Sequence, residues 1–458
     1  MKAVLTSCFL FVVTWAAYYQ SLDFWWTWDD TVILRHAWTY APWQYFLVPE
    51  SWQVLSGASL TPWVSLSFDL DLALLGLHPR GFYVHQLLAL WLTASASHLL
   101  LRLYVRPSAA LFGSLLFLLS APAVAMSHQL MTRHYLEGLL FAVLALCAWV
   151  AAMRAEERRR RGWLLAASLL AYSLAVTAKE VFVPLPFILP FLPEADLKRR
   201  LRSLLPYLLP VGLYCVWRFF MLAALVGGFE EAAEPMLEWQ LRLPLYVMGM
   251  IFGDGTYQTV AMLSLVGLAA LGLWTLSTSR TLIPAALLLV GLPLLPVVPM
   301  LIGQHPLSQR LIILPGWALC MAIALIAGRS SPEREGIRPT LVAGTLLLCA
   351  LLSALGLRQS LAVDSALKEV RKSYEASGRF IHEAGPEQVL IDAGDWFAPS
   401  ALWLRRQGSG DGPSLIFDWI QLDPDDIGKK QFFQYQQGCE CVQDVTARVP
   451  DLWERWKS

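Results

Sequence analysis

The sequence is short of charge. Only 15% of its 458 residues are charged, and 35 basic residues balance 35 acidic ones. A soluble chain of this length divides into domains with charged surfaces. The low fraction of charged residues therefore argues against a soluble protein. Because the formal net charge is zero, no overall field attracts nucleic acid, and no nucleic-acid partner is expected.

The chain also lacks internal repeats, low-complexity segments and metal-ligand spacing among its Cys and His residues. Five of its seven cysteines lie in apolar runs, where they are small core hydrophobes. Cys439 and Cys441 lie two positions apart in polar sequence. Because a disulfide between them closes a very tight ring, two separate thiols are the favoured interpretation, with a disulfide as the alternative.

Long apolar runs are what the sequence has in abundance, since 56% of its residues are hydrophobic. The runs have the length that crosses ~30 Å of hydrocarbon, which predicts a polytopic α-helical membrane protein with about eleven transmembrane helices. The first has no small-residue cleavage site after it and is expected to remain as a helix. The predicted spans are Ala3–Tyr19, Gly81–Tyr104, Ser108–Met126, Tyr135–Met153, Trp163–Thr177, Val181–Leu192, Leu204–Leu222, Gln258–Leu276, Leu282–Leu301, Leu311–Ala327 and Thr340–Leu357.

The distribution of basic residues predicts the orientation. With the N-terminus inside, the inner segments carry 16 basic residues and the outer loops before the tail carry 6, as the positive-inside rule requires. The sixth span, Val181–Leu192, is broken by three prolines. If it did not cross, every later loop would change sides and the bias would disappear. The interpretation is a bacterial inner-membrane protein with a cytoplasmic N-terminus and a periplasmic tail.

The chain is expected to form two domains, a transmembrane domain of residues 1–357 and a soluble domain of residues 358–458. The soluble tail holds 12 of the basic and 16 of the acidic residues. Val363–Ala384 has helical periodicity, and Gln388–Ile391 and Leu415–Phe417 are short apolar runs between turn residues. These patterns predict a small α/β domain.

A long first outer loop, residues 20–80, contains the most informative residues. Asp29 and Asp30 are adjacent carboxylates among aromatic residues at a membrane surface, where they repel each other and are costly to desolvate. They are candidates for catalysis; the alternative is a solvated helix start, with Asp30 as N-cap of Thr31–Thr39. Seven of the 20 tryptophans lie in this loop. An aromatic belt at the interface explains most of them, and stacking on a sugar or lipid is the other interpretation.

Several basic residues from distant segments approach the same membrane face. An arginine at membrane depth costs several kcal/mol unless it is paired, so it indicates a functional site. A cluster of such cations suits a phosphate group at the hydrocarbon boundary, whereas each one taken singly is explained by contact with lipid headgroups. The residues concerned, with their neighbours, are Arg133, His134, Lys179, Glu180, Arg218 and Arg310.

Five motifs in order resemble those of GT-C-fold membrane glycosyltransferases, and are most similar to the transmembrane-and-tetratricopeptide O-mannosyltransferases and their bacterial relatives. The resemblance covers residues 1–330, and the tail resembles the small periplasmic domain of bacterial members. The sequence has Ala121-Pro122 where the family has His-Pro, and it lacks tetratricopeptide repeats. The motifs are Trp28-Asp29-Asp30 with Ile33; Leu60-Thr61-Pro62-Trp63 with Leu75-Gly76-Leu77-His78-Pro79; Ala178-Lys179-Glu180 with Pro184; Arg218-Phe219-Phe220 with Gly227-Gly228; and Ser308-Gln309-Arg310-Leu311 with Pro315.

The resemblance implies transfer of a sugar from a polyprenyl-phosphate carrier to a hydroxyl acceptor outside the membrane, with inversion. Asp29 is the expected base and Asp30 positions the acceptor or the backbone, although these two roles are interchangeable at this stage. No obligatory metal or other cofactor is predicted, because a lipid-monophosphate donor has no pyrophosphate to bind one. The expected phosphate-binding residues are Arg310, Arg218, Lys179 and Arg133, and those expected to position the substrate are Glu180, Trp28 and His134.

Two other functions are compatible with the same number of spans and the same outer-face residues. A transporter or flippase of lipid-linked glycans also has many spans, but usually shows internal repeats and charged or broken helices near the midplane. A glycan polymerase or ligase shares the outer-face chemistry and differs in the size of its donor. The sequence names neither the sugar nor the acceptor, which is a glycan, a lipid or a protein.

Overall fold

The expected helices are present over most of the chain. The computed structural model describes residues 2–57, 59–224, 310, 312–329, 368–393 and 397–457. Three expected spans, Gln258–Leu276, Leu282–Leu301 and Thr340–Leu357, lie outside these residues.

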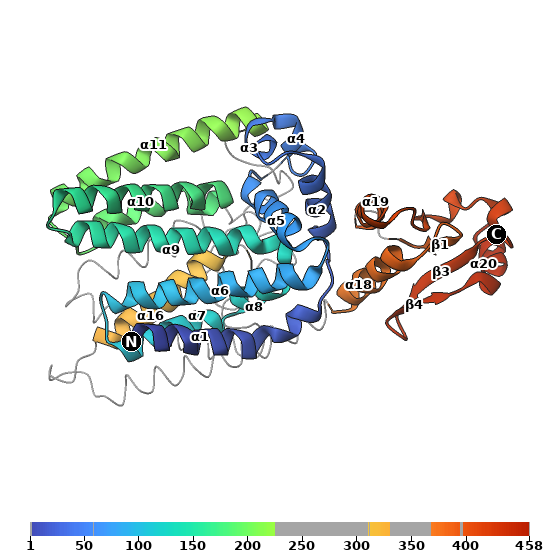
Figure 1. The fold of residues 1–458 in the computed structure, drawn as a ribbon, viewed down its shortest axis with the longest axis horizontal. Helices are drawn as coiled ribbons and strands as arrows, with labels where there is room; N and C mark the ends of the chain where they lie inside the picture. Colours follow the sequence, from blue (N-terminus) through green and yellow to red (C-terminus); the bar gives the residue numbers. More distant parts are fainter. Residues whose placement is uncertain are drawn as a thin grey trace, which may run out of the picture.

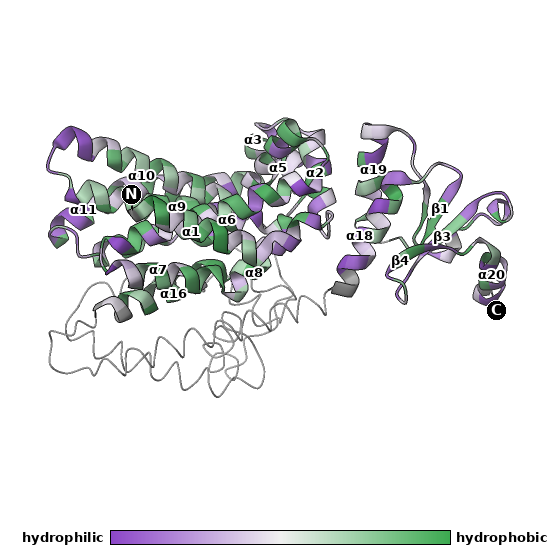
Figure 2. Cartoon of the chain, turned by 60° about the horizontal axis from the view of Figure 1, so that its bottom comes forward, coloured by the Kyte–Doolittle hydropathy of each residue, from purple (hydrophilic) through white to green (hydrophobic). Residues whose placement is uncertain are grey.

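Long helices lie side by side and form a bundle (Figure 1). By length and composition, five segments among the described residues can cross a membrane: Ala3–Asp23, Pro79–Arg102, Leu130–Arg154, Arg158–Ala178 and Leu197–Leu222. The bundle helices are α1 (Lys2–Tyr18), α6 (Pro79–Arg102), α9 (Arg133–Arg154), α10 (Arg158–Ala178) and α11 (Leu197–Leu222). Figure 2 shows hydrophobic residues along these helices, which fits contact with lipid.

The third expected span, Ser108–Met126, is not one straight helix. It forms α7 (Pro107–Leu118) and α8 (Ala121–His128), which meet at an angle of 54°. Ser120, just before α8, has an extended backbone, and Pro122 lies in the first turn of α8. Pro122 has no N–H to donate to the carbonyl four residues earlier, and its ring clashes with that carbonyl, so the helix is interrupted here. A bent pair therefore replaces the expected single helix.

The sixth expected span also departs from an α-helix. Its prolines leave only two 3₁₀ helices, η3 (Glu180–Phe182) and η4 (Leu185–Phe191). The stretch starts beside the outer loop at Lys179, and at its other end Glu194 accepts from Arg154 at 2.9 Å. A 3₁₀ helix rises about 2.0 Å per residue, so the stretch from Glu180 to Phe191 covers about 24 Å. That it is a sixth crossing stays a prediction.

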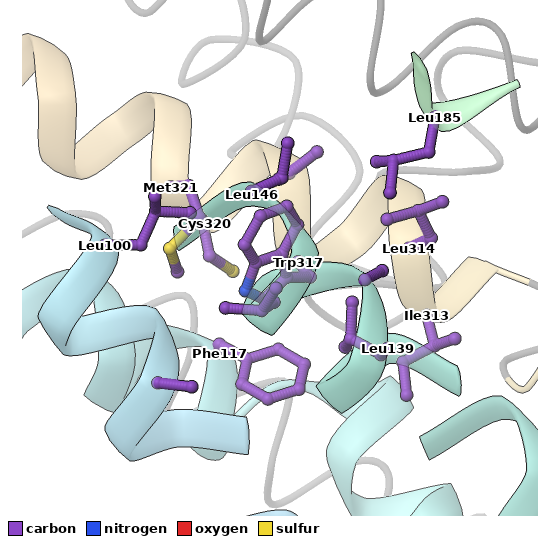
Figure 3. Close-up of a cluster of buried hydrophobic side chains, with 14 of the residues drawn as sticks. Leu100, Phe117, Leu139, Leu146, Leu185, Ile313, Leu314, Trp317, Cys320 and Met321 are labelled. Atoms are coloured by element: carbon purple, nitrogen blue, oxygen red, sulfur yellow. The ribbon is translucent and has the colours of Figure 1, made fainter. Parts of the chain in front are cut away.

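The core of the bundle is a continuous apolar cluster. Helix α16 (Ile313–Arg329), in the region of the expected span Leu311–Ala327, packs against α7. Figure 3 shows Trp317 of α16 in the same cluster as Phe117 and Leu146. The Trp317 indole N–H donates to Ser97 Oγ at 2.7 Å, so its one polar atom is satisfied inside the core.

Short helices of the first outer loop cover one end of the bundle (Figure 1). Trp26, Trp52, Phe68 and Phe82 form a second apolar cluster beneath them. The elements at this end are η1 (Tyr19–Asp23), α2 (Asp30–Thr39), α3 (Gln44–Leu47), α4 (Pro49–Gln53), α5 (Pro62–Leu75) and η2 (Leu130–Thr132).

In its described residues, the tail forms a four-stranded sheet with three α-helices and three short 3₁₀ helices. The strand order is β2-β1-β3-β4, in which β1 pairs in parallel with both β2 and β3, and β4 is antiparallel to β3. Strand β1 has the predicted bounds, and β2 begins one residue earlier than predicted. The elements are α18 (Lys368–Glu383), β1 (Gln388–Ile391), α19 (Ala398–Ser409), β2 (Ser414–Ile416), η7 (Trp419–Gln421), η8 (Pro424–Asp426), β3 (Gln431–Gln436), β4 (Cys441–Asp444), η9 (Thr446–Arg448) and α20 (Val449–Lys457).

Cys439 and Cys441 are joined by a disulfide, so the favoured interpretation of two separate thiols is wrong. Glu440 between them has φ +54°, a left-handed conformation that turns the chain sharply at the end of the β3–β4 hairpin. This turn brings the two Cα atoms to 5.2 Å, within the range that a disulfide needs.

The tail rests on the first outer loop. Thr31 Oγ1 donates to the Phe397 carbonyl at 3.2 Å, and the Arg371 guanidinium lies 3.3 Å from the centre of the Phe24 ring. A Cβ on Gly378 would lie 2.6 Å from the Trp25 indole nitrogen, so α18 approaches the loop too closely for any side chain there.

The contact between α7 and α16 gives a test of the fold. A Cβ on Gly113 would lie 2.5 Å from Ala324 Cβ, whereas a Cβ on Gly162 would meet nothing within 4 Å. We expect Gly113→Ala to lower the free energy of unfolding by about 1–3 kcal/mol through overpacking. Gly162→Ala, also on a bundle helix, should leave it unchanged or raise it slightly. Thermal unfolding in detergent measures both, and equal midpoints would contradict the packing of α7 on α16.

Candidate active site

A sharp turn presents Asp29 at the start of α2. Trp28 has φ +46°, a left-handed conformation that costs a bulky residue about 1–3 kcal/mol and that clusters at functional sites. The turn is closed by two bonds: the Asp30 amide donates to the Thr27 carbonyl, and the Thr27 amide donates to Asp30 Oδ2, both at 2.9 Å. The two acids therefore have different surroundings, because Asp30 points inward and Asp29 lies beside a cavity.

The cavity beside Asp29 has a volume of about 180 Å³. It lies where the first outer loop meets the segments before α9, after α10 and before α16. Asp29 shares it with three of the predicted cationic and positioning residues, which come from three distant parts of the chain. Its lining residues are Asp29, Ile33, Trp52, Leu55, Ser56, Ser59, Thr61, Val64, Met131, His134, Tyr135, Lys179 and Arg310.

Lys179 and Arg310 are the cations of this cavity. Lys179 is buried, with Nζ 3.1 Å from Glu180 Oε1 and 5.2 Å from the centre of the Tyr135 ring. Burial lowers the pKa of the Lys179 ammonium, but the Glu180 carboxylate more than offsets this, so the pKa lies above its usual value. Arg310 Nη1 lies 4.0 Å from Met131 Sδ. Within the part of the chain that the structure describes, no carboxylate pairs with Arg310.

Asp30 is a structural acid rather than a surface group. Its side chain has no exposed area, and burial raises the pKa of Asp30 to about 8, with a further increase from the neighbouring Asp29 charge. The Thr27 amide opposes this increase. Of the two interpretations of Asp30, its position favours the one in which it fixes the backbone. Asp29, and not Asp30 as expected, is the N-cap residue of α2, although its side chain makes no capping hydrogen bond.

Arg133 lies apart from the cavity and is fully buried. Its guanidinium pairs with Asp71 Oδ2 at 2.5 Å and donates to the Phe82 carbonyl at 2.7 Å and to Gln86 Oε1 at 3.2 Å. Such a guanidinium is already bound by groups of its own chain, so we leave Arg133 out of the phosphate-binding set.

Three other predicted residues lie near the cavity without lining it. Arg218, one turn before the end of α11, is buried beside the Tyr214 hydroxyl. Glu180 holds Lys179, and Trp28 packs on the second apolar cluster and makes the turn. Of the three, Glu180 contacts a lining residue, Lys179, directly.

Asp71, the acidic partner of Arg133, was not predicted. Asp71 lies in the apolar sequence of α5, and His85 Nδ1 is 2.7 Å from its Oδ1. Glu137 accepts from Ser67 at 2.8 Å and from the Trp63 indole at 2.5 Å. A carboxylate inside an apolar run needs a partner. The position of Asp71 in the sequence of α5 is therefore a signal from which a buried ion pair could have been predicted. In the described ranges, no three His, Cys, Asp or Glu side chains form a group that can hold a metal ion.

The bundle and the cavity define a polytopic α-helical membrane protein with the GT-C fold. No known protein family and no curated protein matches the sequence. Two similar solved structures are of ArnT from Cupriavidus metallidurans, one bound to undecaprenyl phosphate and one in the apo state. Both are 14% identical to this chain. The bound form covers 87% of this chain and 84% of ArnT with a TM-score of 0.51, and the apo form covers 98% and 95% with 0.53. The likeness confirms the expected fold.

The buried Asp30 predicts a pH-dependent stability. A carboxyl whose pKa is about 8 when folded and 3.8 when exposed takes up a proton on folding between these pH values. Stability is therefore highest at low pH and falls as the pH rises toward 8. Asp30→Asn cannot ionise and accepts the same Thr27 amide, so its thermal midpoint should fall less between pH 5 and pH 8. Thermal unfolding across this range measures the difference, and parallel curves for the two proteins would contradict it.

Proposed function

We propose that the protein is a glycosyltransferase that moves a sugar from a polyprenyl-phosphate carrier to a hydroxyl acceptor. The observation that carries the proposal is the single cavity shared by Asp29, Lys179 and Arg310. A base and two cations in one cavity at the end of a lipid-facing bundle are the groups that this transfer requires. The fold supports the proposal, since ArnT, of similar fold, binds undecaprenyl phosphate.

Asp29 is the general base. An acceptor hydroxyl is a weak nucleophile, so a carboxylate within hydrogen-bonding reach takes its proton as the new bond to the anomeric carbon forms. The bond between that carbon and the phosphate oxygen breaks, and its electron pair leaves with the lipid phosphate. Because this is one displacement from the opposite side, the configuration at the anomeric carbon inverts. Asp30, held by Thr27, fixes the turn that positions Asp29.

Lys179 and Arg310 stabilise the leaving phosphate. Charge develops on the phosphate oxygens as the sugar departs, and fixed cations stabilise it more strongly in a site that excludes water. His134 and Tyr135 complete this side of the cavity and position the donor. The proposed chemistry needs no obligatory metal or other cofactor, because the cations neutralise the phosphate directly.

The proposed location of the site is the periplasmic face of a bacterial inner membrane. Basic residues gather at the other end of the bundle, where Arg154 contacts the Leu103 carbonyl and Glu194. The positive-inside rule makes that end cytoplasmic. The tail contains a disulfide, and disulfides persist in oxidising compartments such as the periplasm. Both observations support an outward-facing site and tail.

Replacing the base tests the reaction. Asp29→Asn should lower transfer of radiolabelled sugar from polyprenyl-phosphate monosaccharides by about 10²–10⁴-fold, because the amide accepts no proton. Asp23→Asn removes an exposed carboxyl from the same loop and should transfer at the wild-type rate. Membranes of equal protein content provide the measurement. Wild-type transfer by Asp29→Asn would sink the proposal, as would movement of a solute without transfer of a sugar.

Replacing the cations tests the leaving-group assignment. Lys179→Met and Arg310→Met should each lower kcat by about 10²–10³-fold, because each removes a charge from the developing phosphate dianion. Arg80→Met, which removes an exposed cation at the start of α6, is the matched control. Steady-state kinetics with varied donor give kcat and KM separately. An unchanged kcat in both cavity variants would contradict the proposed role.

A further inference from the structure

A second cavity lies next to the one that holds Asp29. It has a volume of about 360 Å³ and occupies the groove between α2, the segment after α4, and α19 of the tail. Leu55 lines both cavities, so they share a wall. Its lining residues are Val32, Arg35, His36, Thr39, Tyr40, Val54, Leu55, Pro399, Ser400 and Trp403.

One face of α2 connects the two cavities. Asp29, Ile33, His36 and Tyr40 follow one another at intervals of three or four residues and therefore lie on the same side of the helix. The first two line the smaller cavity and the last two line the groove. From Asp29 to Tyr40 the helix rises about 16 Å, which exceeds the length of a single sugar ring. A chain of several sugar units that lies along this face of α2 therefore reaches Asp29 with one end.

We propose that this groove, with Arg35 and Trp403 on its walls, binds the acceptor, a carbohydrate that carries an acidic group, and delivers its hydroxyl to Asp29. The inference rests on the proposed transferase function and names the acceptor class that this function leaves open. It also gives the tail a role, because Trp403 and Ser400 belong to α19.

Arg35 and Trp403 form the charged part of the groove. The Arg35 guanidinium lies 5.7 Å from the centre of the Trp403 ring, within the range of a cation–π contact, and such a contact with the ring face does not use the guanidinium N–H groups as donors to oxygen. Arg35 is exposed, and none of the carboxylates in the described ranges forms an ion pair with it. A planar guanidinium held in this way matches a carboxylate or a phosphate with two parallel hydrogen bonds.

His36 adds recognition of a neutral group. It is 4% exposed, and its Nε2 donates to the Ser51 carbonyl at 2.9 Å. Burial lowers the pKa of the His36 imidazole, so the ring is neutral and Nδ1 is an acceptor. That nitrogen has no hydrogen-bond partner among the residues that the structure describes. Because this unpaired acceptor is itself buried, it can accept a proton from a sugar hydroxyl only after the His36 ring turns toward the groove that it lines.

Binding to the full-length protein in detergent, without any donor present, tests the inference. The probes are tetragalacturonate and mannose 6-phosphate, two acidic sugars that distinguish a carboxylate from a phosphate, with maltotetraose as the neutral control. One acidic probe should bind at least tenfold more tightly than maltotetraose. Arg35→Gln and Trp403→Ala should each weaken that binding about tenfold, and Trp403→Phe should restore most of it because it keeps an aromatic face.

Two matched variants serve as controls. Trp38→Ala removes an exposed tryptophan that lines a different cavity beside α2, and Arg406→Gln removes an exposed cation from α19. Both should bind the probe as the wild type does. Thermal midpoints and binding of polyprenyl phosphate show that each variant is folded.

Equal binding of acidic and neutral sugars would overturn the inference, as would failure of both acidic probes to bind or wild-type binding by Arg35→Gln and Trp403→Ala. These outcomes are separate from the test of the transferase itself. If the wild-type protein transfers no sugar but binds an acidic probe through Arg35, the proposed reaction is refuted and the carbohydrate site remains.

Discussion

The outer end of the bundle depends on the bonds that the buried Arg133 guanidinium makes. It joins Asp71 of α5 to the Phe82 carbonyl and Gln86 of α6, and it stands on the first turn of α9. Removing one partner of a buried pair costs about 3–5 kcal/mol, because the remaining charge is left without a partner. The bonds of Arg133 therefore fix the start of α9, and they place the next residue, His134, at the wall of the cavity.

The two acids of the first loop lie in different environments. Asp30 is enclosed, accepts the Thr27 amide, and has a pKa of about 8. Asp29 is only partly buried and shares its cavity with Lys179 and Arg310. Adjacent carboxyl groups in unlike environments can serve different purposes, and the proposed reaction gives the chemistry to Asp29 and the fixing of the turn to Asp30.

The sequence predicted the features that depend on local pattern. Apolar length located the bundle helices, and the adjacent acids and the Lys179 and Arg310 motifs identified residues that do share a cavity. Features that depend on tertiary contacts were missed. The engagement of Arg133 by Asp71 requires a neighbour that sequence spacing does not reveal. The interruption at Ser120 and the 3₁₀ form of the sixth segment follow instead from prolines in the local sequence, whose exact effect the apolar pattern did not show. The disulfide was disfavoured on ring size alone, although the left-handed Glu440 makes it possible.

The contact between tail and loop combines charged and apolar groups. Three arginine–aromatic pairs cross it: Arg371 over Phe24, Arg379 over Trp25 and Arg35 over Trp403. At exposed sites such a pair contributes about 0.5–1 kcal/mol, and a buried pair such as that of Arg371 contributes more. The contact also buries Leu404 of α19 in the second apolar cluster, so separating the two parts would expose apolar surface. The tail is therefore a fixed wall of the groove, and Arg35 and Trp403 are held in position beside it.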